Sequence, residues 1–329
     1  MEKEPDRSWL DRLDRWQQRR RFMSFAVAVV RRYGEDRGRQ YGALLSYYGF
    51  VSLFPLLLVL GTVLEVVLAG NPELRAQILD SVYARIPVLG SQLQSNTTTL
   101  SASGLLLVVG LVVAVWAGLA VVRSGQEVVS LQWCVPRFRQ RSFVSAQLRA
   151  LGVLVVFGVG VVLAGIATSL AALVPDTAWG GRVLVAVIAI VLSVVVVSVI
   201  FRMLAASDLR WRDVAAGGVA GGVALWFLQL VGATYVARVI VGATDVYGAF
   251  AAVFGLLVWI ALLAHVLLLA NEINVVRAKR LWPRSLTRTA PTDADRRALG
   301  ETVRRESFLS ESRVVVRDPD ADARQLREG

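Results

Sequence analysis

The stretch VYGAFAAVFGLLVWIALLAHVLLLANEIN, residues 246–274, decides the class of fold. It carries no Asp, Glu, Lys or Arg before Glu272, and it holds the single histidine of the chain, His265. A helix that rises 1.5 Å per residue crosses a hydrocarbon core of about 30 Å within such a run. A strand of a membrane barrel would instead alternate apolar and polar residues. The stretch therefore predicts a transmembrane helix over about Val246–Asn271.

Five further apolar runs have similar lengths, so the sequence predicts an all-α integral membrane protein with six transmembrane helices. The chain has 329 residues, of which 55% are hydrophobic, and its mean hydropathy is +0.56, which few soluble globular proteins reach. The other expected spans are Tyr41–Leu64, Ser101–Val122 with a more polar continuation towards Leu131, Ala150–Val174, Val183–Phe201 and Val214–Ala237.

The basic residues predict the orientation of these spans. The segment up to Gln40 holds 11 Lys and Arg residues and the segment from Arg277 holds 13, while the segments between spans alternate between basic-poor and basic-rich. Basic residues concentrate on the cytoplasmic side of a membrane. We therefore expect both termini in the cytoplasm, and we expect the net charge of +11 to face anionic lipid headgroups and not nucleic acid.

This orientation divides the chain into three parts. Residues 1–40 form a basic cytoplasmic segment, and the short apolar run Phe22–Val30 between arginines predicts an interfacial helix there. Residues 41–276 form the transmembrane domain, with an external segment at 71–103. Residues 277–329 are rich in charged residues and poor in apolar ones, so we expect a cytoplasmic, largely disordered tail.

Nothing in the sequence predicts an enzyme, a cofactor or a metal site. There is no GxSxG, P-loop or HExxH pattern, and one cysteine, Cys134, with one histidine cannot build a Cys- or His-rich metal centre. We therefore expect a non-enzymatic membrane protein.

Two features of the spans predict how the helices pack. Pro55 in SLFPLLL predicts a kink in the first span, because proline removes a backbone N–H and clashes with the carbonyl four residues earlier; the kink is either a plain structural one or the lining of a site. The fifth span has two overlapping GxxxG pairs, which let another backbone approach closely. Packing within the chain is the favoured interpretation and a homo-oligomer interface is the alternative for these residues, Gly217, Gly218, Gly221 and Gly222.

Charged residues near the ends of two spans predict a polar cluster. Trp116, Arg123 and Glu127 share one face of the second span, because they are spaced at helical intervals. His265 and Glu272 share a face of the sixth span, with Asn271 beside Glu272. Since charges within a membrane usually face the protein interior and pair, we expect these two faces to meet and Glu272 to pair with Arg123. The cluster is either a headgroup or proton site, or an interhelical ion pair with a histidine bonded to a carbonyl.

The order and spacing of several motifs resemble the YihY/BrkB family of bacterial inner-membrane proteins over residues 23–277. The matching pieces are ALLSYYGFVSLFPLLL in the first span, VWAGLAVV in the second, DLRWRDVAAGGVAGGVALWFLQ and the stretch quoted above; Asn271 stands where members often have a small residue. The resemblance implies a six-span protein with both termini in the cytoplasm. Some members carry the label ribonuclease BN, which these residues do not support.

Three functions follow as hypotheses. The leading one is transport or flipping of a lipid or another anionic amphipathic molecule, with Arg123 neutralising the headgroup, Glu272 holding Arg123 when the site is empty, and His265 tuning protonation. The second is a non-transporting scaffold for the cell envelope, with the spans as its membrane anchor. An enzyme, including a ribonuclease, is the third and least supported.

Overall fold

The computed structural model describes residues 8–67, 73, 104–139, 142–172, 179–205, 209–235, 249–286 and 291–305. The regular secondary structure within these ranges is helical. The elements in chain order are α1 (Ser8–Arg19), α2 (Arg21–Glu35), α3 (Gly38–Val67), α6 (Gly104–Gln132), the 3-10 helix η2 (Arg137–Arg139), α7 (Phe143–Ala172), α8 (Trp179–Leu204), α9 (Trp211–Tyr235), α11 (Ala249–Lys279) and α12 (Asp293–Arg305).

The apolar runs form the long helices, as the sequence predicts. Four segments among the described residues are long and apolar enough to cross a membrane: Phe143–Ala167, Trp179–Leu204, Trp211–Gly232 and Val253–Lys279. The predicted first span lies within α3, and the predicted second span lies in α6 from Gly104 onwards; each helix includes residues whose side chains are not described. The all-helical membrane fold is therefore confirmed, while the number six and the orientation of the termini stay predictions.

Two predictions concern residues outside the described part. The external segment 71–103 lies there apart from Glu73, and the side chain of Pro55 lies there as well, although Pro55 is within α3. The expected kink of the first span stays a prediction for this reason.

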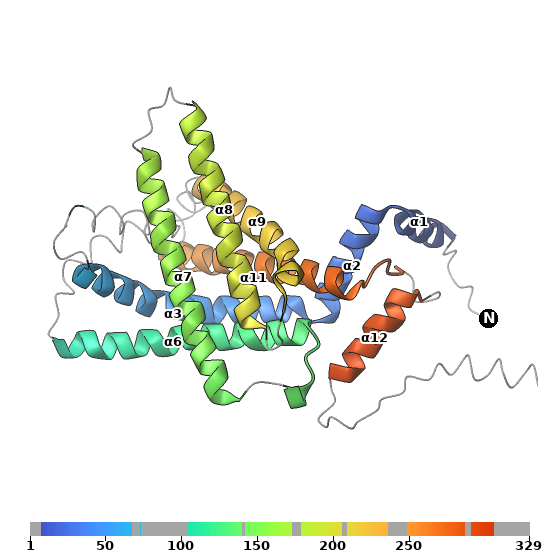
Figure 1. The fold of residues 1–329 in the computed structure, drawn as a ribbon, viewed down its shortest axis with the longest axis horizontal. Coiled ribbons are helices and arrows are strands. Elements are labelled where there is room, and N and C mark those ends of the chain that lie inside the picture. Colours follow the sequence, from blue (N-terminus) through green and yellow to red (C-terminus); the bar gives the residue numbers. More distant parts are fainter. Residues whose placement is uncertain are drawn as a thin grey trace, which may run out of the picture.

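The long helices pack in an order that brings α6, α11 and α9 together. Figure 1 shows α3 and α6 side by side, with α7 and α8 as a second pair inclined steeply to them. Helix α11 packs against α3 on one side and α9 on the other, and α9 packs along α8. The outer faces of α7 and α8 expose large apolar side chains, among them Leu148, Val155 and Val191, as expected for helices in contact with lipid.

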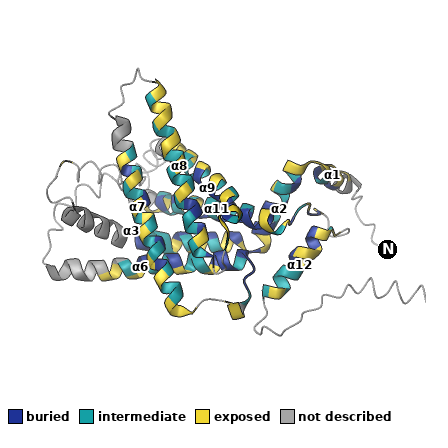
Figure 2. Ribbon diagram, viewed as in Figure 1, coloured by how far each residue is buried: buried dark blue, intermediate teal, exposed yellow. Residues whose placement is uncertain are grey.

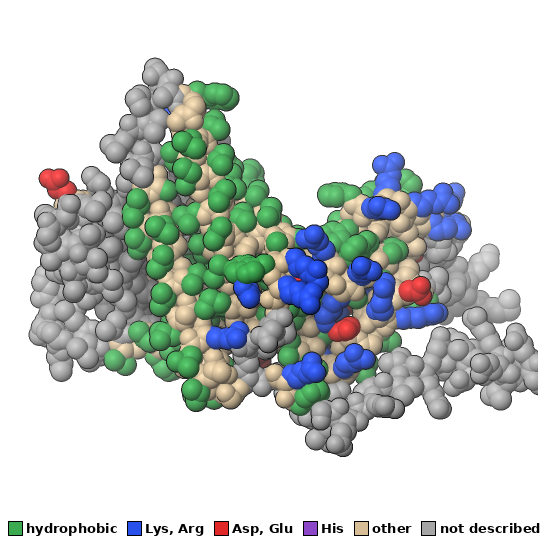
Figure 3. Space-filling view, in the orientation of Figure 1, with side chains coloured by type: hydrophobic (Ala, Val, Ile, Leu, Met, Phe, Trp, Pro, Cys, Tyr) green, Lys and Arg blue, Asp and Glu red, His purple; other side chains and the backbone are tan. Residues whose placement is uncertain are grey.

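The buried residues gather at one end of this bundle (Figure 2). The largest apolar cluster joins α2, the ends of α6 and α11, and α12, and its members include Val29, Trp133, Val276, Leu281 and Ala298. Lys and Arg side chains cover the surface around it, whereas apolar side chains cover α7 and α8 (Figure 3). We call this region the basic end: α1, α2, α12 and the ends of α6 and α11 that pack against them.

The expectation of a largely disordered tail is wrong for the described residues of that segment. Residues 281–286 and helix α12 pack onto the basic end, with Ala294 and Ala298 buried. A capping box begins α12: the N–H of Thr292 donates to Asp295 Oδ2 over 2.9 Å, and the N–H of Asp295 donates to Thr292 Oγ1 over 3.2 Å. Each side chain satisfies a backbone donor that the first helical turn leaves without a partner.

The glycines of α9 lie in contacts between helices of the same chain. A Cβ at Gly217 or Gly221 would meet Ala270 of α11, and one at Gly222 would lie 2.6 Å from the backbone of Val194 in α8. Gly218 faces Ser198 of α8 in the same way. The two overlapping GxxxG pairs therefore allow α8 and α11 to pack closely on α9, and Gly221 contacts both neighbours. This is the intramolecular packing that the sequence favoured.

The contact at Gly222 predicts the effect of a single methyl group. We expect Gly222→Ala to destabilise the protein by about 1–3 kcal/mol, because backbone atoms of α8 cannot rotate out of the way as a side chain can. Gly158→Ala in α7 is the matched control, since a Cβ there meets nothing within 4 Å. It should be neutral or stabilise the helix by up to about 1 kcal/mol. Thermal unfolding in detergent compares the two, and equal midpoints for both variants would contradict the close packing of α8 on α9.

Candidate functional site

Gln132 at the end of α6 connects α6 to α11 through buried hydrogen bonds. Its Nε2 donates to Glu272 Oε1 over 2.8 Å and to the carbonyl of Leu268 over 3.1 Å. Its Oε1 accepts a hydrogen bond of 2.6 Å from Asn271 Nδ2, and Trp133 Nε1 lies 3.4 Å from Asn271 Oδ1. Gln132, Asn271 and Glu272 are at most 1% exposed. We call Gln132, Trp133, Asn271 and Glu272 the Gln132 cluster.

The turn after α6 brings a second group of polar side chains to the Gln132 cluster. Cys134 has a left-handed backbone (φ 51°), and the N–H of Val135 donates to the carbonyl of Ser130 over 3.0 Å. This geometry is a Schellman cap. The turn places Cys134 Sγ 2.8 Å from Nη2 of Arg32, whose side chain is fully buried.

Arg32 lies between the Gln132 cluster and the tail. Its Nε is 2.8 Å from Asp36 Oδ2, and Asp36 Oδ1 also accepts from Arg305 of α12 over 3.2 Å. Burial lowers the pKa of Arg32, but the neighbouring acidic groups, Asp36 first among them, have the larger effect, so the pKa of Arg32 is raised. The guanidinium is therefore a permanent buried cation.

Asn274 of α11 joins α9 to the same region. Its Oδ1 accepts a hydrogen bond of 2.5 Å from the backbone N–H of Gly217 in α9. This N–H lies in the interior of α9 near its start, and the absence of a side chain at Gly217 lets Asn274 approach it. Polar bonds over about two turns of α11, from Leu268 to Asn274, therefore fix its end against α6 and α9.

The structure places His265 away from the Gln132 cluster. Its Nδ1 lies 2.6 Å from the carbonyl of Ala261 in the preceding turn. Its ring covers Gly42 of α3, where a Cβ would lie 2.6 Å from the imidazole. This geometry is that of the structural alternative, a half-buried histidine bonded to a carbonyl and packed between α11 and α3.

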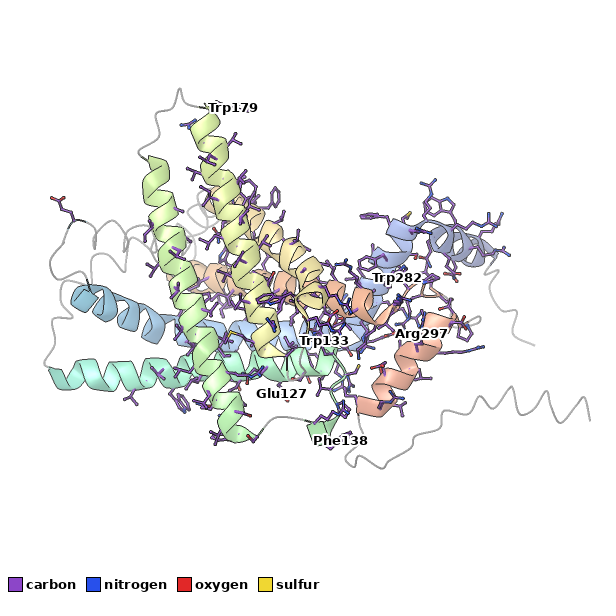
Figure 4. All side chains as sticks on the ribbon, viewed as in Figure 1. Glu127, Trp133, Phe138, Trp179, Trp282 and Arg297 are labelled. Atoms are coloured by element: carbon purple, nitrogen blue, oxygen red, sulfur yellow. The ribbon has the colours of Figure 1, made fainter. Side chains whose placement is uncertain are left out.

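The predicted meeting of Arg123 with Glu272 is wrong. Arg123 and Glu127 are exposed on α6, and Trp116 on the same helix is 73% exposed. Arg123 lies over the ring of Phe143 at the start of α7, at 4.7 Å from its centroid. Figure 4 shows Trp133 at the junction of the helices and Glu127 further back along α6. The physical reason is that Gln132, one turn beyond Glu127 and on another face of α6, is the residue that reaches Glu272.

The tail is held by a network of carboxylates and arginines that sequence reasoning missed. Arg284 donates to Asp295 Oδ1 and to Glu35 Oε1, both over 2.6 Å, and Arg31 lies 3.1 Å from each of these carboxylates. On the other side, Asp14 of α1 accepts from the hydroxyl of Ser285 over 2.9 Å. We call these residues the terminal ion-pair network, because they join both ends of the chain: Asp14, Arg31, Glu35, Arg284, Ser285 and Asp295.

Two carboxylates of the terminal ion-pair network have a lowered pKa. Burial raises the pKa of Asp295, but hydrogen bonds from the N–H groups of Ser285 and Thr292, from the Thr292 hydroxyl and from Arg284 outweigh it. Burial acts on Asp14 in the same direction and is outweighed by hydrogen bonds from Leu286, Gln17 and Ser285. Both carboxylates are therefore ionised at neutral pH and stabilise the docked tail in that form.

The sequence held a signal for part of this arrangement. The TDAD sequence at 292–295 has the spacing of a capping box and marks the start of a helix in the tail. Gln132 and Arg32 carry no such mark, because a single glutamine or arginine at a helix end is ordinary. Their roles follow from burial, which the sequence does not show.

The chain is, by these features, a helical integral membrane protein with a polar core at one end. It belongs to the family described as virulence factor BrkB, whose model matches residues 29–294. The family resemblance expected from the motifs is thereby confirmed, and the matched region extends through the docked tail to the start of α12.

Two curated relatives are similar over a shorter stretch. One is the inner membrane protein YhjD of Escherichia coli (strain K12), 28% identical over 118 residues, which are 35% of each chain. The other is an uncharacterized protein of Dickeya dadantii (strain 3937), 28% identical over 104 residues, 31% of this chain and 32% of the relative. The matches span about a third of the length of these relatives. No solved structure matches the chain.

Removal of Gln132 tests the role of the Gln132 cluster. Gln132→Ala leaves Asn271 Nδ2 and Glu272 Oε1 without the hydrogen bonds that they make with Gln132, so we expect it to destabilise the protein by about 2 kcal/mol or more. Gln126→Ala is the matched control on the same helix, where a partly buried amide donates one bond to Ala146 and its loss costs about 1 kcal/mol. Thermal unfolding in detergent measures both, and an equal effect would show that the cluster does not hold α6 to α11.

The lowered pKa of Asp295 gives a pH dependence for the docked tail. A depressed pKa adds stability above the unfolded value of 3.8 that is lost as the pH falls below it. We expect hydrogen exchange of residues 281–286 and 291–305, corrected for the intrinsic rate, to stay slow from pH 7 to about pH 4 and to rise below it.

Asp295→Asn should raise that exchange already at pH 7, because it removes the carboxylate that Ser285, Thr292 and Arg284 share. Asp293→Asn is its control: Asp293 lies in the same turn of α12, but its side chain is 92% exposed and 3.9 Å from Arg296. Equal exchange in the two variants would contradict the role of Asp295.

Proposed function

We propose that this chain is an integral protein of the bacterial inner membrane that binds an anionic lipid, or another anionic amphipathic molecule, and moves it across the membrane. The site lies on the exposed face of α6 formed by Trp116, Arg123 and Glu127. Six spans with both termini in the cytoplasm complete the proposal. The Escherichia coli relative is named an inner membrane protein, which supports the location.

The observation that carries the proposal is a charged pair on the outer face of an apolar helix. Arg123 and Glu127 are one turn apart and exposed, and the helix before them is almost continuously apolar. A charged side chain that faces lipid is costly unless a partner neutralises it. Basic residues near the membrane surface attract anionic headgroups, so a lipid phosphate is a suitable partner for Arg123.

The neighbouring aromatic residues suit an amphipathic ligand. Phe143 stacks under the Arg123 guanidinium and fixes its position, which leaves the donors at the edge of the guanidinium for a phosphate. Trp116 stands two turns further along the same face, about 10 Å away along the axis, where an acyl chain would follow the helix. In this arrangement Glu127 limits how firmly the headgroup binds, because its negative charge repels a phosphate.

Lipid transport by the purified protein tests this function. Vesicles of phosphatidylglycerol and phosphatidylcholine with a trace of fluorescent phosphatidylglycerol report movement between leaflets when dithionite quenches the outer leaflet. We expect wild-type protein to raise the rate above that of protein-free vesicles. Arg123→Ala should lower it about tenfold, which corresponds to the loss of about 1.4 kcal/mol of headgroup binding.

Arg202→Ala is the matched control. Arg202 is also exposed and also stacks on an aromatic ring, Trp211, at 4.4 Å, but it belongs to α8. Its variant should transport at the wild-type rate. Equal rates for wild-type and Arg123→Ala protein would show that Arg123 on α6 does not take part in transport. A wild-type rate equal to that of protein-free vesicles would favour a non-transporting scaffold.

A further inference from the structure

Glu272 has one carboxylate oxygen without a partner in a fully buried position. Oε1 accepts from Gln132, but Oε2 is buried and has no hydrogen-bond partner among the described residues. The residue is 0% exposed. A carboxylate in such surroundings is strongly disfavoured in its ionised form unless a cation pairs with it.

The hydrogen bonds around Gln132 cannot supply a second donor to Glu272. Asn271 donates to Gln132 Oε1, which fixes the orientation of the amide. Gln132 Nε2 already divides its two hydrogens between Glu272 Oε1 and the carbonyl of Leu268. The single bond from a neutral amide therefore remains the contact of Glu272 with α6.

The nearest cation is committed to other partners. Arg32 is close enough for its charge to act on Glu272, yet its hydrogen-bonding atoms face Asp36, Cys134 and, over 3.4 Å, Thr302. Two buried carboxylates, Asp36 and Glu272, therefore depend on one buried guanidinium, and Asp36 has the ion pair.

From this geometry we propose that Glu272 is a proton-binding site: it carries a proton while Arg32 is paired with Asp36, and the proton passes to Asp36 when Arg32 turns to Glu272. The ligand is a proton, and the change that exchanges it is a shift of one guanidinium between two carboxylates. The protonation of Glu272 is independent of whether α6 binds lipid.

The charges that face Glu272 agree with this assignment. Helix α2 presents Arg32, Glu35 and Asp36, and the two acids disfavour a negative charge on Glu272 while Arg32 favours it. The hydroxyl of Tyr33, also on α2, is buried without a described partner. The side chains of α6 that face Glu272 are neutral. Cys134 contacts Arg32, and Arg305 pairs with Asp36, so both affect Glu272 only through these two residues.

The pKa of Asp36 determines the pH at which the protonation of Glu272 should be tested. Burial raises its pKa from 3.8 to about 6 against the opposing effect of Arg32 and Arg305. Because this pKa is raised, ionised Asp36 destabilises the fold above about pH 6, and protonation relieves that cost as the pH falls. At pH 8 Asp36 is ionised and holds Arg32, so Glu272 should be protonated.

Infrared spectroscopy of the purified protein at pH 8 reads this proton directly. A protonated carboxylic acid has a carbonyl stretching band that an ionised carboxylate lacks. We expect the wild-type spectrum to contain such a band and Glu272→Gln, which imitates the protonated form, to fold and lack it. Glu127→Gln is the matched control, because Glu127 is exposed on α6, and it should leave the band unchanged.

Asp36→Asn tests the sharing of Arg32. Its neutral side chain no longer holds the guanidinium, so Arg32 should pair with Glu272 and the band should disappear. If a variant does not fold, glutamate labelled with ¹³C at the carboxyl carbon should shift the wild-type band, and labelled aspartate should not. The absence of a glutamic acid band at pH 8 would overturn the proposal, and a band that persists in Asp36→Asn would overturn the exchange between the two carboxylates.

Discussion

The hydrogen bonds of Gln132 to α11 are the interaction on which the rest of the structure depends. Apolar contact holds helices together weakly in a membrane, since lipid tails are as apolar as the side chains. Polar groups that satisfy one another across an interface specify which faces meet. Here Gln132, Asn271 and Asn274 fix the end of α11 against α6 and α9 in one register. The close contacts at the glycines of α9 then set the distance at which α8 and α11 pack.

The sequence predicted the helices well because length and apolarity determine them, but it did not predict which face of each helix is buried. In a soluble protein the apolar stripe of a helix marks its interior face. α6 is apolar around most of its circumference, so the position of an apolar stripe does not tell its buried face from its exposed face. The spacing of Trp116, Arg123 and Glu127 correctly places them on one face, and only the structure shows that this face is the exposed one.

The described part of the tail, residues 281–286 and 291–305, was misjudged for a different reason. A charge-rich segment with few apolar residues cannot build a core, and by itself it would remain unfolded. Its described residues fold because their partners lie near the other end of the chain. Arg284 donates to Glu35 of α2, and Ser285 donates to Asp14 of α1. Composition describes a segment in isolation, and a network formed between positions more than 200 residues apart lies beyond it.

Charge balance connects the buried end of α11, around Glu272, with the docked tail. Arg32 belongs to the interior beside Glu272 and also to the network at the surface, through Asp36 and then Arg305 of α12. In a region of low dielectric constant one cation stabilises one anion far better than it stabilises two. A change in the protonation of either carboxylate therefore alters the pairing of Arg32, and with it the contact of Asp36 with α12. The buried end of α11 and the docked tail are in this sense parts of one electrostatic unit, joined by a single guanidinium.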